Sequence, residues 1–272
     1  MRKQLSRDES KASVGTLARG LDILELFTGD RSELTQKEIS ETLSMPVPTV
    51  HRLSKLLIER GWLVRDPATR RLRLGLGVAR LLPALLSGLR LPDLARDHLR
   101  SMAEQTGETV NLAVLDDDEV VYLASESGPR LLTLRSPVGL RLPVHCTALG
   151  KCLLAQLDDD AAREAAGPEP YATLTSRTIT SWNGLRKGLQ RIRRDGVAIS
   201  HEEYEVGLES IAAPLAWIEG HGPAALNVSL PSSRARGGAA DNLVADLLAT
   251  ASAIETAAGV QRGGRPFAGA AA

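Results

Sequence analysis

Basic and hydroxyl side chains gather in two short stretches of the first third of the sequence, and these groups suit contacts with nucleic acid. The first stretch carries four of them at the start of a helical pattern, namely Thr49, His51, Arg52 and Lys55. The second carries four arginines, namely Arg65, Arg70, Arg71 and Arg73. Arginine and lysine bind DNA phosphates, and arginine can also donate two hydrogen bonds to one guanine. Both stretches therefore indicate double-stranded DNA as a partner.

The two stretches differ in what they can recognise. Arg52 suits a bidentate contact with guanine and equally a contact with a phosphate, and the sequence leaves both roles open. The four arginines of the second stretch are expected on phosphates or in the minor groove. Contacts of that kind position a protein on DNA more than they specify a base sequence.

A helix-turn-helix would position the first stretch. Thr35 and Glu38 have the spacing of a capping box, which predicts the start of a short helix. Residues 44–46 interrupt that helix, and a second helix follows with Pro48 in its first turn. Its expected buried positions are Val50, Leu53, Leu56 and Leu57. Gly61 is placed to end this helix, which would enter a major groove.

A hairpin would position the four arginines. Residues 62–65 and 71–74 have the pattern of two strands, joined by a turn that begins at Asp66 and Pro67. The alternation in the second strand predicts Leu72 and Leu74 facing inward and Arg71 facing water with Arg73. A helix-turn-helix followed by such a hairpin predicts a winged helix, preceded by a first helix at 16–27 with Leu17, Leu21, Leu24 and Phe27 on one face.

Charge divides the chain into two parts. Residues 1–90 hold 16 Lys and Arg against 10 Asp and Glu, and the remainder holds 17 against 23. A basic first third suits a polyanion, and 272 residues are enough for a second domain with another partner. We expect a disordered arm at 1–14, a DNA-binding domain at 15–75, a linker helix at 76–90, an effector-binding domain at 91–258 and a disordered tail at 259–272.

Several classes of protein are disfavoured. Cys146 and Cys152 are the only cysteines, so no disulfide framework is expected, and the charged N-terminus lacks the apolar core of a signal peptide. The longest apolar run, at 81–89, is too short to cross a bilayer. We expect a cytoplasmic protein without a membrane partner. The apolar linker helix either packs within its own subunit or pairs with its copy in a second chain, and we favour the second arrangement.

The second domain is predicted to be α+β, with helices covering an antiparallel sheet. Leu91 and Pro92 are expected to break the chain before a helix at 93–105. Strands are predicted at 109–115, 120–125, 131–135, 197–200, 210–215 and 224–230, and a turn at 137–139. Helices are predicted at 148–157 with Thr147 as its cap, from Ser181 to Gly196, and at 241–258.

Metal and enzyme chemistry are the alternatives. His145, Cys146, Cys152 and His201 raise the question of zinc, but a spacing of six between the cysteines matches no usual ligand pattern. The sequence contains no nucleophile elbow, phosphate-binding glycine loop or H-E-x-x-H motif. We therefore expect no metal, no cofactor and no catalytic residues. A small-molecule enzyme of the second domain, or an architectural DNA-binding protein without a ligand, remain the competing hypotheses.

Motifs in both halves of the chain resemble the IclR-type bacterial transcriptional regulators. Residues 46–53 (PVPTVHRL) look like the start of that family's recognition helix, which adds Val47 and Pro48 to the expected DNA contacts. Residues 142–151 (LPVHCTALGK), 207–214 (GLESIAAP) and 224–229 (AALNVS) resemble its effector-domain motifs. The resemblance implies a winged-helix domain, a linker helix, a GAF-like effector domain, and dimers that often pair into tetramers.

The resemblance also implies which residues face an effector, namely Leu134, Leu142, Ala148, Leu149, Ser200, Leu208, Ser210, Asn227 and Ser229. Asn227 and Ser229 are two apart on a predicted strand, so their side chains share a face. The competing interpretation is that both faces of this strand are half-solvated and that neither binds a ligand. No lysine or arginine is among these positions. A small organic acid would therefore be bound by hydroxyls, the amide and the free N–H groups after Thr147. We expect a ligand-responsive regulator, a repressor of a catabolic operon, on a pseudo-palindromic operator as a dimer or pair of dimers.

Overall fold

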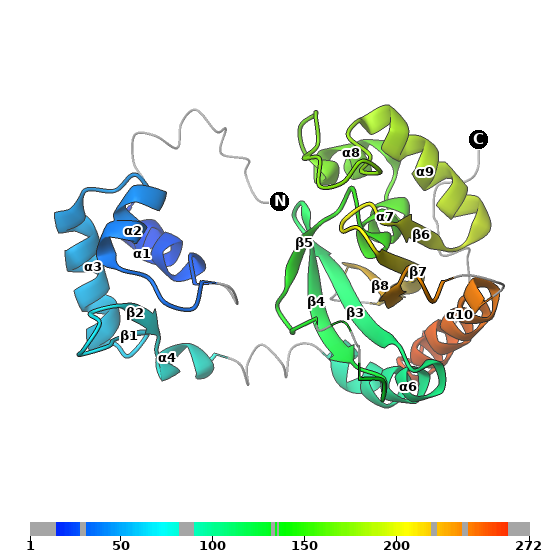
Figure 1. Ribbon diagram of the computed structural model, residues 1–272, viewed down its shortest axis with the longest axis horizontal. Coiled ribbons are helices and arrows are strands. Elements are labelled where there is room, and N and C mark those ends of the chain that lie inside the picture. The colour runs from blue at the N-terminus through cyan, green and yellow to red at the C-terminus, as the bar shows by residue number, and fades with distance from the viewer. Residues whose placement is uncertain are drawn as a thin grey trace. The chain divides into compact units, whose positions relative to one another are not determined.

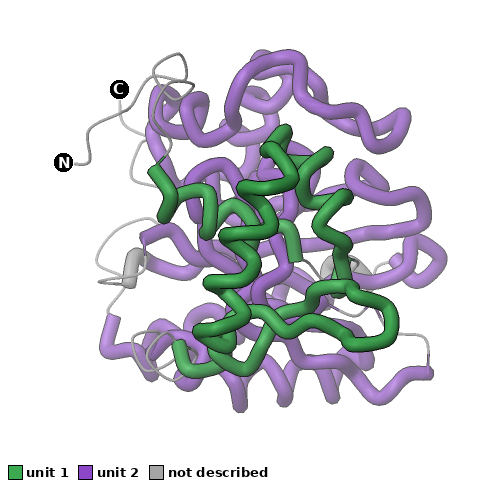
Figure 2. The backbone as a smooth tube through the Cα atoms, turned by 90° about the vertical axis from the view of Figure 1, so that its left-hand side faces the viewer, with its two compact units in different colours: residues 1–88 green, residues 89–272 purple. Residues whose placement is uncertain are grey.

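The computed structural model describes residues 15–27, 31–81, 90–131, 134, 136–218, 222–235 and 239–260. The chain divides into two compact units, residues 1–88 and residues 89–272 (Figure 2). The predicted arm at 1–14, residues 82–89 of the predicted linker helix and residues 261–272 of the predicted tail lie outside the described residues. Within the described ranges, no helix has both the length and the apolar character needed to cross a membrane.

The first unit combines helices with a two-stranded hairpin (Figure 1). Its elements are α1 (Thr16–Glu25), α2 (Gln36–Thr42), α3 (Val47–Glu59), β1 (Leu63–Arg65), β2 (Leu72–Leu74) and the short α4 (Leu76–Ala79). The strands pair antiparallel, with Leu63 opposite Leu74. Ile23, Ile39 and Val50 bring the three longer helices into one core with Leu63 and Leu72 of the hairpin. The predicted winged helix is therefore confirmed as a fold.

The boundaries of the helix-turn-helix follow from local chemistry. The Thr35 hydroxyl accepts a hydrogen bond from the Glu38 backbone N–H at 3.2 Å, and the Glu38 carboxylate accepts one from the Thr35 N–H at 2.6 Å. This is the predicted capping box. Pro48 lies in the first turn of α3. Gly61, one residue after the C-cap, has a φ of 75°, a conformation that favours glycine.

In the first unit, some of the residues predicted to be buried face solvent instead. Four leucines assigned to apolar faces are exposed instead, namely Leu17, Leu21, Leu56 and Leu74. In α1 the fully buried residue is Ile23, and in α3 Ser54 is buried beside Leu53. Apolar periodicity predicts a helix reliably, but a small core covers only a narrow strip of it.

The second unit is built on a six-stranded antiparallel sheet with the order β5-β4-β3-β8-β7-β6. Its strands are β3 (Thr109–Asp116), β4 (Glu119–Glu126), β5 (Arg141–Pro143), β6 (Ala198–His201), β7 (Leu208–Ile218) and β8 (Gly222–Pro231). Helices α6 (Arg90–Thr106) and α10 (Ala239–Ala257) cover one face. Helices α7 (Ala148–Ala155), α8 (Asp159–Ala166) and α9 (Trp182–Asp195) pack on the other (Figure 1).

Predicted caps hold two of these helices in place. The Thr147 hydroxyl accepts from the Gly150 N–H at 3.0 Å at the start of α7, and the Ser181 hydroxyl accepts from the Gly184 N–H at 3.4 Å at the start of α9. A Cβ at Gly150 would lie 2.3 Å from Val144, so only glycine lets α7 approach the segment before it. These contacts fix the N-terminus of α7 against the sheet.

The second unit departs from the prediction in four places. Leu91 and Pro92 do not break the chain; both are buried in the first turn of α6, where proline is tolerated because its N–H would have no acceptor. Strand β5 and helix α8 were not predicted. Leu131 and Leu134 lie in no strand, and residues 132, 133 and 135 of the strand predicted there lie outside the described residues. The remaining predicted strands and helices are present with small differences at their ends.

Candidate functional site

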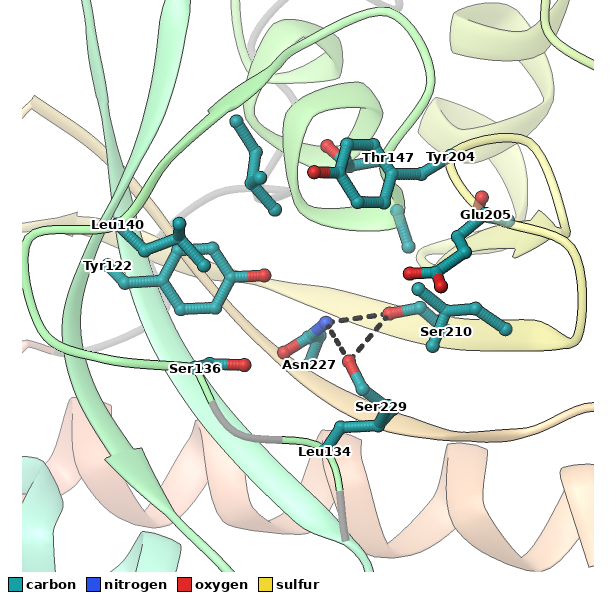
Figure 3. A pocket seen from close by; sticks show the side chains of 14 residues that line it. Tyr122, Leu134, Ser136, Leu140, Thr147, Tyr204, Glu205, Ser210, Asn227 and Ser229 are labelled. Atoms are coloured by element: carbon teal, nitrogen blue, oxygen red, sulfur yellow. Dashed lines mark hydrogen bonds between the residues drawn. The ribbon is translucent and has the colours of Figure 1, made fainter. Parts of the chain in front are cut away.

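A cavity of about 250 Å³ lies in the second unit between the sheet and the start of α7 (Figure 3). Its lining residues are Tyr122, Leu134, Ser136, Leu140, Leu142, Thr147, Ala148, Ser200, Tyr204, Glu205, Leu208, Ser210, Asn227 and Ser229. Eight of the nine predicted effector positions are among them. The ninth, Leu149, is fully buried in the core under α7 instead. Successive helix positions point in different directions, and Ala148 takes the one that faces the cavity.

Six lining residues were not predicted, namely Tyr122, Ser136, Leu140, Thr147, Tyr204 and Glu205. Tyr122 lies on a predicted strand two residues after Val120, so the two side chains share one face, and this spacing is a signal that could have found it. Thr147 was assigned only as a helix cap. Tyr204 and Glu205 lie in the segment between β6 and β7, which carries no periodic pattern. A loop without a periodic pattern gives no local sequence signal that its side chains line a cavity.

A row of hydroxyls crosses four strands on the cavity face of the sheet. Strand register places Ser200 opposite Ser210, Ser210 opposite Ser229, and Ser229 opposite Thr109. Ser200, Ser210 and Ser229 line the cavity, and the Thr109 hydroxyl donates to the Leu134 carbonyl at 2.8 Å. That last contact holds Leu134 at the cavity edge. The sheet therefore presents a row of hydroxyls on its cavity face.

Asn227 organises this row. Its amide nitrogen donates to the hydroxyl oxygens of Ser210 at 2.6 Å and Ser229 at 2.9 Å (Figure 3). Its carbonyl oxygen accepts from the amide of Asn111 at 2.9 Å, and the Asn111 carbonyl accepts from the Ser125 hydroxyl at 2.7 Å. Asn111 and Asn227 are directly opposite each other in the register and are both buried. Every polar atom of the Asn227 side chain is therefore used.

The cavity has no cationic lining residue within the described part of the chain. The one carboxylate among the described lining residues is that of Glu205, which is solvent-exposed. Burial raises the pKa of the Tyr122 phenol, and the nearby Tyr204 adds to the effect, so Tyr122 stays a neutral hydrogen-bond donor. The lining can therefore bind a polar group through hydroxyls and the N-terminus of α7, without an ion pair.

A buried ion pair links α7 to the segment that carries Tyr204 and Glu205. Lys151 on α7 donates to the Glu203 carboxylate and, at 2.8 Å, to the Ile199 carbonyl. The hydroxyls of Thr175 and Thr178 donate to the backbone carbonyls of Glu202 and Glu203, each at 2.7 Å. Burial lowers the pKa of Lys151, and the Glu203 carboxylate opposes that shift. The segment that carries Tyr204 and Glu205 is thus held from two sides.

The residues considered for zinc have other partners. The His145 ring stacks on Tyr171 with centroids 5.1 Å apart, and its Nε2 lies 3.0 Å from the Ala172 carbonyl oxygen. Cys146 and Cys152 are buried, and burial raises the pKa of Cys146 to about 12. Among the described residues, no three histidine, cysteine or acidic side chains come together in a group suited to a metal.

The predicted DNA-contact residues of α3 lie on its outer side. Thr49 is half-buried, and the other five are exposed, namely Val47, Pro48, His51, Arg52 and Lys55. Lys55 forms only a loose ion pair with Glu59 at 3.9 Å. This face is free of the unit's own core and is able to meet base edges.

The four hairpin arginines have different environments. Arg70 and Arg73 are exposed, whereas Arg65 is half-buried and its Nε has no hydrogen-bond partner within the described ranges. Arg71, predicted to face water, is half-buried instead: it lies 3.2 Å from the Glu38 carboxylate and donates to the Glu33 carbonyl at 3.1 Å. Glu38 also caps α2, and the cap hydrogen bonds, more than Arg71, lower its pKa. Arg71 therefore ties the hairpin to α2.

Two family models match the chain. The IclR helix-turn-helix domain matches residues 16–67, and the bacterial transcriptional regulator IclR C-terminal domain matches residues 84–256. The Pca regulon regulatory protein of Pseudomonas putida is 36% identical over 215 residues, covering 79% of this chain and 73% of that protein. The p-hydroxybenzoate hydroxylase transcriptional activator of Acinetobacter baylyi is 34% identical over 230 residues, covering 81% and 83%.

A solved structure has the same arrangement of elements. The IclR homologue of Microbacterium hydrocarbonoxydans, crystallised with 4-hydroxybenzoate, is 29% identical with a TM-score of 0.76, over 90% of this chain and 99% of that one. The winged helix-turn-helix and the antiparallel-sheet domain predicted from the sequence are both confirmed by these matches. The chain is therefore a DNA-binding transcriptional regulator rather than an enzyme, and it belongs to the IclR family.

Proposed function

We propose that this regulator controls a catabolic operon by binding a pseudo-palindromic operator and responding to a small carboxylate or aromatic acid. The observation that carries this proposal is the cavity whose sheet wall bears Ser210, Asn227 and Ser229 among apolar residues. A buried, fully hydrogen-bonded polar group adds little to stability compared with apolar packing. Its placement at the wall of a cavity is explained by a ligand.

The size and polarity of the cavity define the proposed ligand. Its volume of about 250 Å³ is below the ~300–1,000 Å³ typical of pockets for drug-sized molecules, so a single ring or a short chain fits. Hydroxyls and the first N–H groups of α7 suit a carboxylate, because a helix N-terminus favours negative charge. The Acinetobacter relative is a transcriptional activator of p-hydroxybenzoate hydroxylase, and the Microbacterium homologue is complexed with 4-hydroxybenzoate. Both support an aromatic acid here.

The operator is proposed to be read by the exposed face of α3. Thr49, His51 and Arg52 would meet base edges in the major groove, while Arg70 and Arg73 would lie on phosphates. Half-sites related by a two-fold axis follow from a homodimer or a pair of dimers, which we propose as the assembly in the cytoplasm. We further propose that the unliganded protein represses transcription and that the ligand shifts it to a state with lower operator affinity.

A ligand screen on the full chain tests the proposal. Thermal unfolding is measured with small aliphatic and aromatic acids, because a ligand that binds the folded state raises the unfolding temperature. Acids that stabilise the protein are then added to operator-binding and promoter-reporter assays, which give the sign of regulation. The proposal fails if no acid changes both the unfolding temperature and operator affinity.

A further inference from the structure

A chain of hydrogen bonds runs in one direction from strand β4 to the cavity. Ser125 donates to the Asn111 carbonyl, Asn111 donates to the Asn227 carbonyl, and Asn227 donates to Ser210 and Ser229. Of these residues, Ser125 and Asn111 do not line the cavity. Asn111 is fully buried, and Ser125 is half-buried at the far end of the chain.

The direction of this chain determines what the cavity offers to a ligand. Both amide hydrogens of Asn227 are directed at serine oxygens, so each serine acts as an acceptor toward Asn227. Each serine then keeps its own O–H hydrogen. One of these can bridge the 3.4 Å between Ser210 and Ser229, and the other is left to point into the cavity as a donor. If the amides were turned over, the serines would donate to Asn227, and the cavity would present lone pairs instead.

Asn111 decides between these two arrangements. An asparagine side chain offers a carbonyl at one end and an NH₂ at the other, so the orientation of Asn111 dictates that of Asn227 opposite it. The Ser125 hydroxyl donates to the Asn111 carbonyl, which therefore faces β4 in this structure. Hydrogen bonds in such a chain polarise one another, which strengthens the donor at its end.

We propose that Asn111, oriented by Ser125, is a positioning residue that makes the Ser210–Ser229 end of the cavity a hydrogen-bond donor and so selects ligands with an acceptor atom there. This inference rests on the proposed function only in taking the cavity as the ligand site. It concerns two residues that touch no ligand and act through Asn227.

Neutron diffraction from crystals of the ligand-free full chain tests the direction without any ligand. Deuterium on the Asn227 amide atom that faces Ser210 and Ser229, and on the Asn111 atom that faces Asn227, supports the proposal. Deuterium on an Asn227 atom directed at Asn111 overturns it.

Binding of two probes of equal shape and opposite polarity tests the consequence. Benzoate only accepts hydrogen bonds through its carboxylate, whereas benzamidine, as a cation, only donates. Calorimetry with the wild-type full chain is expected to give tighter binding of benzoate. Burial favours the neutral form of a carboxyl group, so Asn111→Asp is assayed at a pH high enough to ionise it. The ionised carboxylate cannot donate, so Asn227 must turn its NH₂ toward it and the serine protons are used on Asn227. Benzoate affinity should fall about tenfold or more, while benzamidine should gain.

Acetophenone separates polarity from charge in this variant, because it carries a neutral acceptor. A turned amide weakens acetophenone as well as benzoate. If Asn111→Asp weakens benzoate and leaves acetophenone unchanged, the effect is charge repulsion alone and the proposal is wrong.

Ser125→Ala is the milder second variant, since Ser125 is only half-buried and its loss removes the anchor of Asn111 alone. It should keep the circular dichroism spectrum and reduce the ratio of benzoate to benzamidine affinity by a few-fold. An unchanged ratio contradicts the role of Ser125. If the wild type binds none of the probes, the aromatic-acid part of the proposed function fails, while the neutron result still decides the direction of the chain.

Discussion

The amide nitrogen of Asn227 on β8 lies 2.6 Å from the hydroxyl oxygen of Ser210 on β7, and no other polar contact in the sheet wall of the cavity is shorter among the described residues. The register of β7 and β8 determines which hydroxyls the Asn227 amide can reach. Ala212, not Ser210, is the direct cross-strand partner of Asn227, so the amide reaches along the strand to a diagonal neighbour. One asparagine thereby contacts two of the three serines of the neighbouring row, Ser210 and Ser229.

Asn227→Leu is predicted to abolish the ligand's effect on operator binding and to leave ligand-free operator affinity unchanged. Leucine removes the donors to Ser210 and Ser229 and leaves the Asn111 amide without an acceptor, which should also cost about 1–3 kcal/mol of stability. Fluorescence anisotropy with labelled operator, with and without ligand, measures the first effect, and denaturant unfolding measures the second. Asn183→Leu, at an exposed site on α9, is the matched control. A normal response of Asn227→Leu at the wild-type ligand concentration would place the ligand elsewhere.

Local chemistry explains which parts of the fold could be predicted from the sequence. Caps such as Thr35 and Thr147 act within four residues, so their helices were located correctly. Alternation along β8 placed Asn227 and Ser229 on one face. The same alternation holds for Thr109 and Asn111 on β3, and it could have indicated them as well.

Long-range register explains what could not be predicted. The row of Ser200, Ser210, Ser229 and Thr109 depends on pairings between strands far apart in the chain. A shift of one residue would turn each strand's side chains to the other face, and no local pattern fixes that choice. The rotation of a helix about its axis is likewise set by long-range packing. Leu56 is exposed and Leu149 is buried because the packing partner, and not the apolar pattern, decides which residue is buried.

Arg73→Ala is predicted to reduce the salt dependence of operator binding. Each phosphate contact contributes about 0.9 to the slope of log affinity against log salt, so loss of two contacts in a dimer should flatten the slope by roughly 2. Arg71→Ala should change the slope less, because its guanidinium is held by Glu38. Operator titrations at several salt concentrations compare the two variants. An unchanged slope for Arg73→Ala means that the hairpin is off the DNA, and equal slopes mean that Arg71 leaves Glu38 on binding.

Arg52→Ala separates the two roles that the sequence leaves open. Loss of a bidentate contact with guanine should cost about 1–3 kcal/mol on the operator and relax specificity at one position of each half-site. Loss of a phosphate contact would weaken operator and random DNA equally. Binding to a set of operators with single substitutions distinguishes these results. We expect the first, because Arg52 is exposed in the N-terminal half of α3, the part of a recognition helix that contacts base edges. Equal losses on all sequences would assign Arg52 to the backbone.

The buried ion pair between Lys151 and Glu203 gives the last prediction. Only about 5% of the Lys151 side chain and 10% of the Glu203 side chain are exposed. Removing one partner leaves a buried charge without compensation, so Lys151→Met or Glu203→Leu should each cost about 3–5 kcal/mol. The double variant Lys151→Met with Glu203→Leu should cost much less than the sum, because it buries no charge.

Urea unfolding of the two single variants and the double variant measures this coupling. Lys37→Met is the control, since Lys37 pairs with Glu41 on the exposed side of α2 and should cost less than about 1 kcal/mol. Ligand affinity gives a second measurement. Glu203 directly precedes two residues of the cavity lining, Tyr204 and Glu205, and the ion pair holds that segment. The double variant should therefore regain stability without regaining full ligand affinity. Additive losses in stability would show that Lys151 and Glu203 act separately, and wild-type affinity in the double variant would show that the ion pair does not position the lining.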